Sequence, residues 1–133
     1  FVLVDHILAQ NSNAAHHTLC VLHQERVEPM VVLWAVMREL QLLLRITQMP
    51  ENTADIFKQN RVWPARQQVL SRAASRMSAK KLTWLLQYGQ RIDQTIKGLG
   101  AHDVWQGLEC LVLISAGARF SPKMAQMQRV WPE

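Results

Sequence analysis

A tryptophan among basic side chains is the arrangement in this sequence that points most directly to ligand binding. It lies in residues 58–66, which read KQNRVWPAR, with Pro64 placed to open a helix. Guanidinium groups bind phosphates, an indole ring stacks on an unpaired base, and a helix N-terminus attracts anions. Arg61, Trp63 and Arg66 are therefore candidates for contact with nucleic acid. The alternative is that Trp63 packs on the hydrophobic core while the arginines are solvated.

The basic side chains continue past this turn. Residues 58–97 carry nine basic side chains and one acid, whereas residues 1–57 carry three basic side chains and six acids. A solvated surface normally intersperses the two signs of charge, and this segment does not. The further members of this secondary basic surface are Lys58, Arg72, Arg76, Lys80 and Lys81.

A second group of residues has the spacing of metal ligands. His16, Cys20 and His23 stand at i, i+4 and i+7, so a helix places all three on one face. Zinc accepts such side chains, but a structural zinc site needs four ligands and no fourth is apparent. An ordinary helix face is the simpler interpretation, and the sequence predicts no metal and no cofactor.

No catalytic residue is predicted. Acid–base catalysis needs carboxylates or histidines brought together, whereas the acids of this chain are solitary. Glu39 and Glu109 lie among apolar residues, and because a buried carboxylate needs a cationic or hydrogen-bonding partner, both are expected in structural ion pairs. The chain also lacks a phosphate-binding glycine loop and a G-x-S-x-G motif.

Helices must position these residues. Apolar side chains recur at three- and four-residue spacing over most of the chain, which is the helical period. Loops of two to six residues favour antiparallel neighbours, so the sequence predicts an all-α, antiparallel helical bundle of about five to seven helices. The expected helices cover residues 1–8, about 12–26, 29–48, 52 or 53 through 57, 64–77, 79–97 and about 102–116.

Two of these helices carry informative patterns. The helix 29–48 has one narrow polar strip, and the apolar remainder of its circumference is expected to be surrounded by other helices. The helix 79–97 contains Gly89 within its apolar seam. Glycine inside a helix costs about 1 kcal/mol, so we expect Gly89 to let another backbone approach closely. The polar strip consists of Arg38, Gln41, Arg45 and Gln48.

The length fits one domain, expected at residues 1–117, followed by a loosely ordered tail at 118–133 with little periodicity. Cys20 and Cys110 lie in apolar runs and are expected to be buried, reduced thiols, as in a cytoplasmic protein.

Membrane and export signals are not apparent. The most apolar stretch, 30–46, is interrupted by charged side chains and is shorter than a membrane span. The chain begins at Phe1 without a basic leader or an initiator Met, so we expect a fragment of a longer protein.

Three motifs, taken together, resemble a known family. Residues 27–43 (VEPMVVLWAVMRELQLL) resemble the central helix of the delta subunit of the bacterial DNA polymerase III clamp loader, with E-P at the start and R-E-L after an aliphatic run. Residues 57–66 resemble the F-x-x-x-R-V-W-x-x-R turn of that family, and residues 104–109 resemble its V-W-x-x-L-E helix opening. The order and spacing of the motifs agree over about residues 1–117.

The resemblance implies a C-terminal collar domain. Such a bundle joins delta-prime and the gamma or tau copies into a pentamer that loads the sliding clamp onto primed DNA. Contact with the clamp belongs to preceding domains that this chain lacks. The domain would have no catalytic activity of its own, although it would be part of the DNA polymerase III holoenzyme, a DNA-directed DNA polymerase. The candidates for its subunit interface are Arg38, Gln41, Arg45, Gln48 and Gly89.

The resemblance also favours contact between primer–template DNA and the turn that holds Arg61, Trp63 and Arg66. One departure concerns residues 98–100 (GLG), where close relatives can carry an aromatic residue near the template path. A strand-separating role at that position is therefore in doubt for this chain.

Two other classes of function compete with this interpretation. A free-standing helical nucleic-acid-binding regulator would explain the basic segment, but it would need side chains that read base edges in a groove. A helical-bundle enzyme would need a cluster of acids or histidines that the sequence does not show.

Overall fold

The computed structural model describes residues 2–98 and 103–118, and this part of the chain is helical without strands. The prediction of an all-α bundle is confirmed. Its seven α-helices and one short 3-10 helix are α1 (Val2–Leu8), α2 (Ser12–Gln24), α3 (Pro29–Gln48), η1 (Pro50–Asn52), α4 (Thr53–Gln59), α5 (Pro64–Arg76), α6 (Ala79–Ile96) and α7 (Val104–Ser115).

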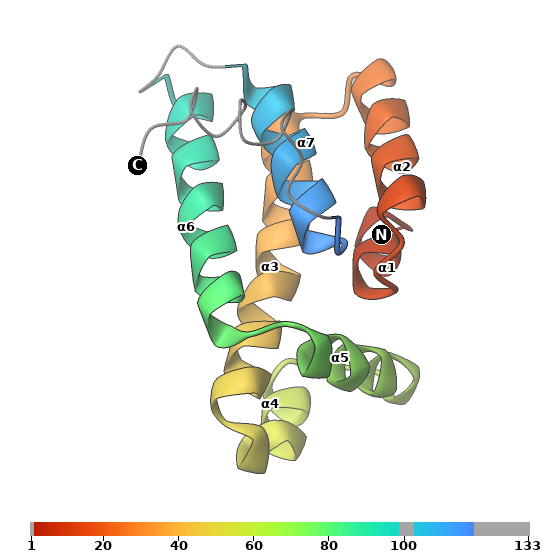
Figure 1. Ribbon diagram of the computed structural model, residues 1–133, viewed down its shortest axis with the longest axis vertical. Helices are drawn as coiled ribbons and strands as arrows, with labels where there is room; N and C mark the ends of the chain where they lie inside the picture. The colour runs from red at the N-terminus through yellow and green to blue at the C-terminus, as the bar shows by residue number, and fades with distance from the viewer. Residues whose placement is uncertain (1, 99–102, 119–133) are drawn as a thin grey trace.

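Helix α3 is the centre of the bundle. It packs most extensively against α6, and it also contacts α1, α4, α5 and α7. Figure 1 shows α6 running beside α3 in the opposite direction and α7 returning antiparallel to α6. Helix α2 covers α1 and α7. The core is built from the fully buried leucines of α3 and α6, among them Leu33, Leu40, Leu43, Leu82 and Leu85.

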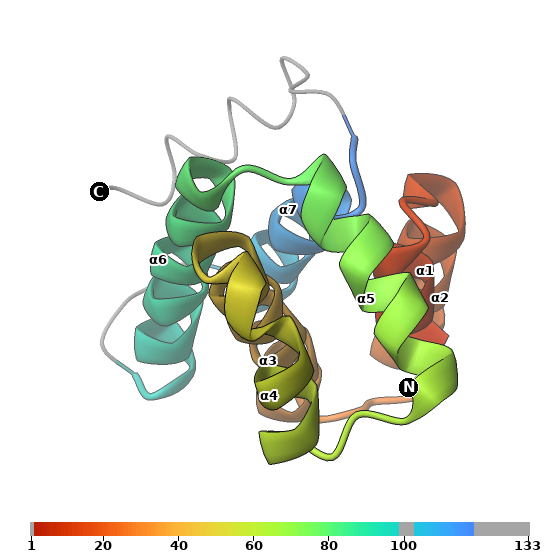
Figure 2. The ribbon, with the colours of Figure 1, turned by 90° about the horizontal axis from the view of Figure 1, so that it is seen from below.

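Helices α4 and α5 close one end of the bundle. Figure 2, seen from that end, shows α5 crossing beneath the other helices, so it is not an antiparallel member of the bundle. Pro64 opens α5 immediately after the extended residue Trp63, which redirects the chain there. The turn between α4 and α5 is thereby placed beside the exposed side of α3.

Local signals in the sequence account for most helix ends. The side chains of Asn11, Ser78 and Asp103 accept hydrogen bonds from backbone N–H groups of the first turns of α2, α6 and α7. Gly98 and Gly117, at φ +85° and +92°, stand directly after the C-caps of α6 and α7, as expected for helix-ending glycines.

Three helices end with the same geometry but without glycine. Gln10, Arg26 and Arg61 adopt φ values of 58°, 60° and 52°. At Arg26 the backbone N–H bonds to the carbonyl of His23, and the next N–H bonds to that of Leu22, which is the Schellman pattern. These three left-handed residues could not be predicted from the sequence, because glycine is the usual signal for this conformation.

Several expectations need correction. Helix α4 extends to Gln59, beyond the expected end at residue 57. Cys20 is exposed, whereas Cys110 is buried, and both are free thiols. The cause is that Cys20 lines a depression between α2 and α7 that is open to solvent. The predicted tail lies outside the described residues apart from Ala118, as does most of the 98–100 segment.

Gly89 is approached by a side chain and not by another backbone. A Cβ at this position would overlap Sδ of Met37 on α3. The missing side chain therefore lets α6 lie close to α3 within the same bundle.

No helix in the described ranges, 2–98 and 103–118, has the length and hydrophobicity of a membrane span.

Candidate nucleic-acid interface

The turn between α4 and α5 presents Trp63 to solvent. Arg61 ends α4 in the left-handed conformation, with its N–H bonded to the Lys58 carbonyl, and the N–H of Val62 bonds to the Phe57 carbonyl. Val62 packs against the core, as the residue after a Schellman turn usually does. The side chain of Trp63 is 76% exposed, so the alternative that it packs in the core is wrong.

The exposed side of α3 and this turn enclose one hollow of about 260 Å³. It unites the polar strip of α3 with the basic turn, two groups that the sequence analysis treated separately. We call it the arginine hollow, and its polar and aromatic lining comprises Arg38, Glu39, Gln41, Arg45, Asn60, Arg61, Trp63 and Arg66.

Arg66 is engaged by two carboxylates. Its Nη2 lies 2.7 Å from Oε1 of Glu39 on α3, and its Nη1 lies 3.4 Å from Oδ1 of Asp5 on α1. The expected structural ion pair of Glu39 is thus confirmed, with a partner from another helix. These contacts connect α1, α3 and α5, and they offset most of the charge of Arg66.

The other three arginines of the hollow are not neutralised in this way. Arg38, Arg45 and Arg61 are exposed and form no ion pair within the described part of the chain. Gln41 lies between Arg38 and Arg45 on the same side of α3 and contributes further amide donors. The hollow therefore carries an excess of positive charge beside an exposed indole ring.

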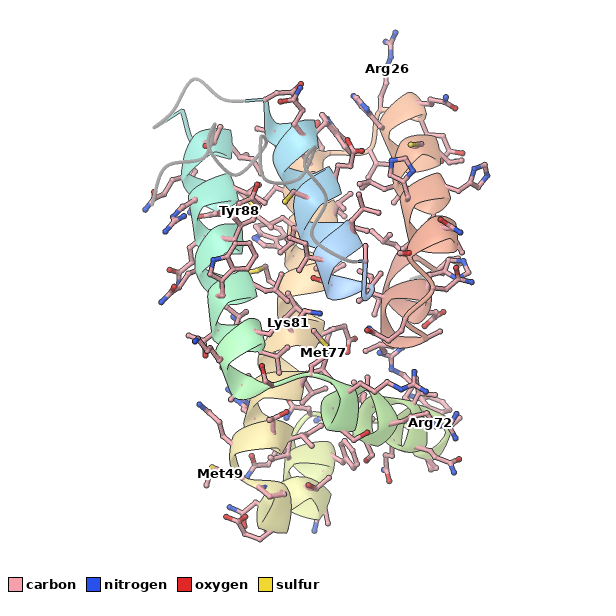
Figure 3. The ribbon with its side chains drawn as sticks, in the orientation of Figure 1. Arg26, Met49, Arg72, Met77, Lys81 and Tyr88 are labelled. Atoms are coloured by element: carbon pink, nitrogen blue, oxygen red, sulfur yellow. The ribbon has the colours of Figure 1, made fainter. Side chains whose placement is uncertain are left out.

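The secondary basic surface does not join this hollow. Lys58, Arg72 and Arg76 are exposed elsewhere on α4 and α5, and Figure 3 shows Arg72 on α5, apart from Lys81 near the start of α6. Lys80 and Lys81 border a different depression beside Ile114 of α7. Burial lowers the pKa of Lys81 below its usual value.

The candidates for a subunit interface divide into two groups. Arg38, Gln41, Arg45 and Gln48 are exposed as expected. Gly89 is buried against α3, where Met37 occupies the space beside it.

Two exposed apolar side chains on α3 were not expected from the sequence. Trp34 is 64% exposed and Val31 is 45% exposed, although both were expected to be covered. Continuing the polar strip backward from Arg38 at helical spacing leads to both residues, so the periodicity contained this signal.

His16, Cys20 and His23 lie where α2 packs against α7. Nε2 of His16 lies 3.1 Å from Oε1 of Glu109, which gives Glu109 its expected partner. The ring of His23 stacks on Trp105, with centroids 4.2 Å apart. The described residues contain no arrangement of three or more such side chains that could hold a metal ion.

Comparison with known proteins identifies the family. Residues 1–121 match the family model described as processivity clamp loader gamma complex DNA pol III C-term. The chain belongs to this family. It is also 33% identical over 116 residues to DNA polymerase III subunit delta of Escherichia coli (strain K12), which confirms the resemblance to the C-terminal region of delta. The match covers 86% of this chain and 34% of the relative, so the chain spans about a third of that protein.

Proposed function

We propose that this chain is the collar domain of a clamp-loader delta subunit. It helps to hold delta-prime and the gamma or tau subunits in the pentamer that loads the sliding clamp onto primed DNA. The match of residues 1–121 to the clamp-loader C-terminal family carries this proposal. The domain takes part in DNA polymerase III function by assembly, without a reaction of its own, and the clamp is contacted by domains outside this chain.

Exposed apolar side chains on α3 support a role in assembly. Trp34 and Val31 stand next to the polar strip and are exposed to solvent over much of their surface. Tryptophan is enriched where protein surfaces become buried on association. The same helix thus offers an apolar patch at its N-terminal half and the arginine hollow at its C-terminal half.

We propose further that the turn holding Arg61, Trp63 and Arg66 lies against the template strand. The 76% exposure of Trp63 supports this part, because a base can stack only on an accessible indole face. Stacking on Trp63 and phosphate contacts with the arginines do not depend on the identity of the bases, so this contact requires no sequence-specific recognition.

Co-elution of the chain with purified gamma-type and delta-prime collars tests the assembly role. We expect a stable complex at micromolar concentration and no nucleotide hydrolysis by the chain alone. Absence of co-elution would count against the collar role. Sequence-selective binding to duplex DNA that persists at moderate salt would instead favour a free-standing regulator.

A further inference from the structure

We infer that Arg38 and Arg45 of α3, together with Arg61, bind the phosphates of the strand whose base stacks on Trp63, and that Arg66 is a positioning residue. The inference rests on the proposed contact with the template strand. It moves two residues from the expected subunit interface to the DNA site. It also removes Arg66 from the phosphate ligands.

Three arginines around the arginine hollow carry its excess of positive charge. Arg38 and Arg45 lie two helical turns apart on one side of α3, and Arg61 faces the same hollow from the α4–α5 turn. None of the three has an anionic partner within the residues described. Three unpaired guanidinium groups around one hollow repel one another, and an anion placed between them relieves that repulsion.

Arg66 is already held in an ion pair with Glu39. The side chain of its partner Glu39 is only 16% exposed, so moving Arg66 toward a phosphate would leave a largely buried carboxylate without its counter-ion. The backbone N–H of Arg66 bonds to the Trp63 carbonyl at 2.9 Å. The Arg66–Glu39 pair therefore holds the first turn of α5, and with it Trp63, against α3.

The position of Trp63 indicates which kind of nucleic acid the hollow binds. Trp63 projects at the edge of the hollow, where an unpaired base can cover its ring while the attached phosphate reaches the arginines. A base inside a duplex is stacked on both faces and cannot do so. Single-stranded DNA is therefore the expected occupant.

The salt dependence of binding separates phosphate ligands from a positioning residue. For single strands, each phosphate contact contributes about 0.7 to the slope of log K against log salt. We expect the double variant Arg38→Gln/Arg45→Gln to bind a primer–template with a single-stranded tail roughly tenfold more weakly or worse, and to lose about 1.4 from the slope. Arg66→Gln should lower affinity without changing the slope, and Arg66→Lys should restore it.

At Arg61 the side chain can be removed without changing the backbone conformation of the turn. Arg61→Gly places the residue that favours positive φ in the turn, so it removes the guanidinium and retains the Schellman geometry. Arg26→Gly is the matched control, because Arg26 has the same geometry at the end of α2, far from α4 and α5 (Figure 3). Arg61→Gly should reduce the slope by about 0.7, and Arg26→Gly should leave it unchanged.

These slopes are measured by fluorescence anisotropy of a labelled primer–template at several salt concentrations. The measurement is made on loader that contains the full-length subunit and on the chain alone. Assembly of each variant is followed by co-elution. The inference would be overturned if the variant Arg38→Gln/Arg45→Gln failed to assemble while the chain alone kept the wild-type slope. These two residues would then belong to the subunit interface. A reduced slope for Arg66→Gln would also overturn it. Failure of the wild-type chain to assemble would refute the collar role instead, while its slopes would still test the phosphate site.

Discussion

At the scale of the residue, the exposure of Trp63 is the feature with the clearest consequence. A large aromatic side chain in water contributes little to the core, and Trp63 is more exposed than any other large apolar side chain in the described ranges. The turn that carries it is held by hydrogen bonds of the backbone and by the Arg66–Glu39 pair. The indole can therefore be removed without disturbing its surroundings.

The variant Trp63→Ala tests this separation of stability from binding. We expect the free energy of unfolding to change by less than about 0.5 kcal/mol, because the side chain is exposed. Binding of a primer–template with a single-stranded tail to the assembled loader should weaken by roughly 1–3 kcal/mol if one base stacks on the ring. Val69→Ala is the control, since it removes another exposed apolar side chain, on α5, that does not line the arginine hollow. Equal losses from both variants would contradict the assignment.

At the scale of the element, the packing of α6 on α3 depends on Gly89. The Met37 side chain fills the space that a Cβ of Gly89 would take, so the two helices pack closely because a flexible side chain of α3 lies against a glycine of α6. Glycine lowers helix propensity, but here it permits the most extensive helix contact of the fold.

Gly89→Ala should have opposite effects in two backgrounds. In the wild type it overpacks the α3–α6 contact and should lower the free energy of unfolding by up to about 2 kcal/mol, after the gain in helix propensity. In a Met37→Ala background the space is open, and the same change should raise it by about 1 kcal/mol. Urea denaturation of the four proteins in this double-mutant cycle measures the coupling. An identical effect in both backgrounds would show that Met37 does not restrict the site.

At the scale of the whole molecule, a buried polar pair joins the halves of the bundle. Tyr88 points from α6 into the interior (Figure 3), where its hydroxyl interacts electrostatically with the buried Cys110 of α7. Burial raises the pKa of Tyr88 far above its ordinary value, and the nearby Cys110 thiol raises it further. Burial also raises the pKa of Cys110, while the nearby Tyr88 hydroxyl lowers it and Glu109 raises it further.

Stability should therefore fall in alkaline solution. The folded protein keeps both protons at pH values where the unfolded chain releases them, so the contribution is complete below about pH 8.5 and is lost as the pH rises. Each group should lower the free energy of unfolding by up to about 1.4 kcal/mol per pH unit above the pKa of its unfolded form. Urea denaturation between pH 8 and 11 measures the slope, and Tyr88→Phe should make it shallower above about pH 10. Parallel profiles for the two proteins would refute this account.

The sequence by itself determined the helices, their order and most of their ends. Apolar periodicity, Pro29 and Pro64 at helix starts, and Gly98 and Gly117 after helix ends are local signals, so they need no knowledge of distant contacts. It also indicated the turn at Trp63 as a binding element and the ion-paired state of Glu39. The left-handed conformation of Arg26 and Arg61 could not be predicted, because arginine has no preference for positive φ.

Only the tertiary structure decided which of these residues act together. The arginine hollow combines Arg38 and Arg45 with Arg61 because α4 and α5, which follow α3 in the chain, turn back beside it, and the direction of that turn is not contained in the periodicity of any one helix. The same packing gives Arg66 to Glu39 and Asp5. It also leaves Trp34 uncovered, although its helix is otherwise central. Sequence periodicity specifies the faces of one helix, whereas the neighbour of each face depends on how all the helices fill the core together.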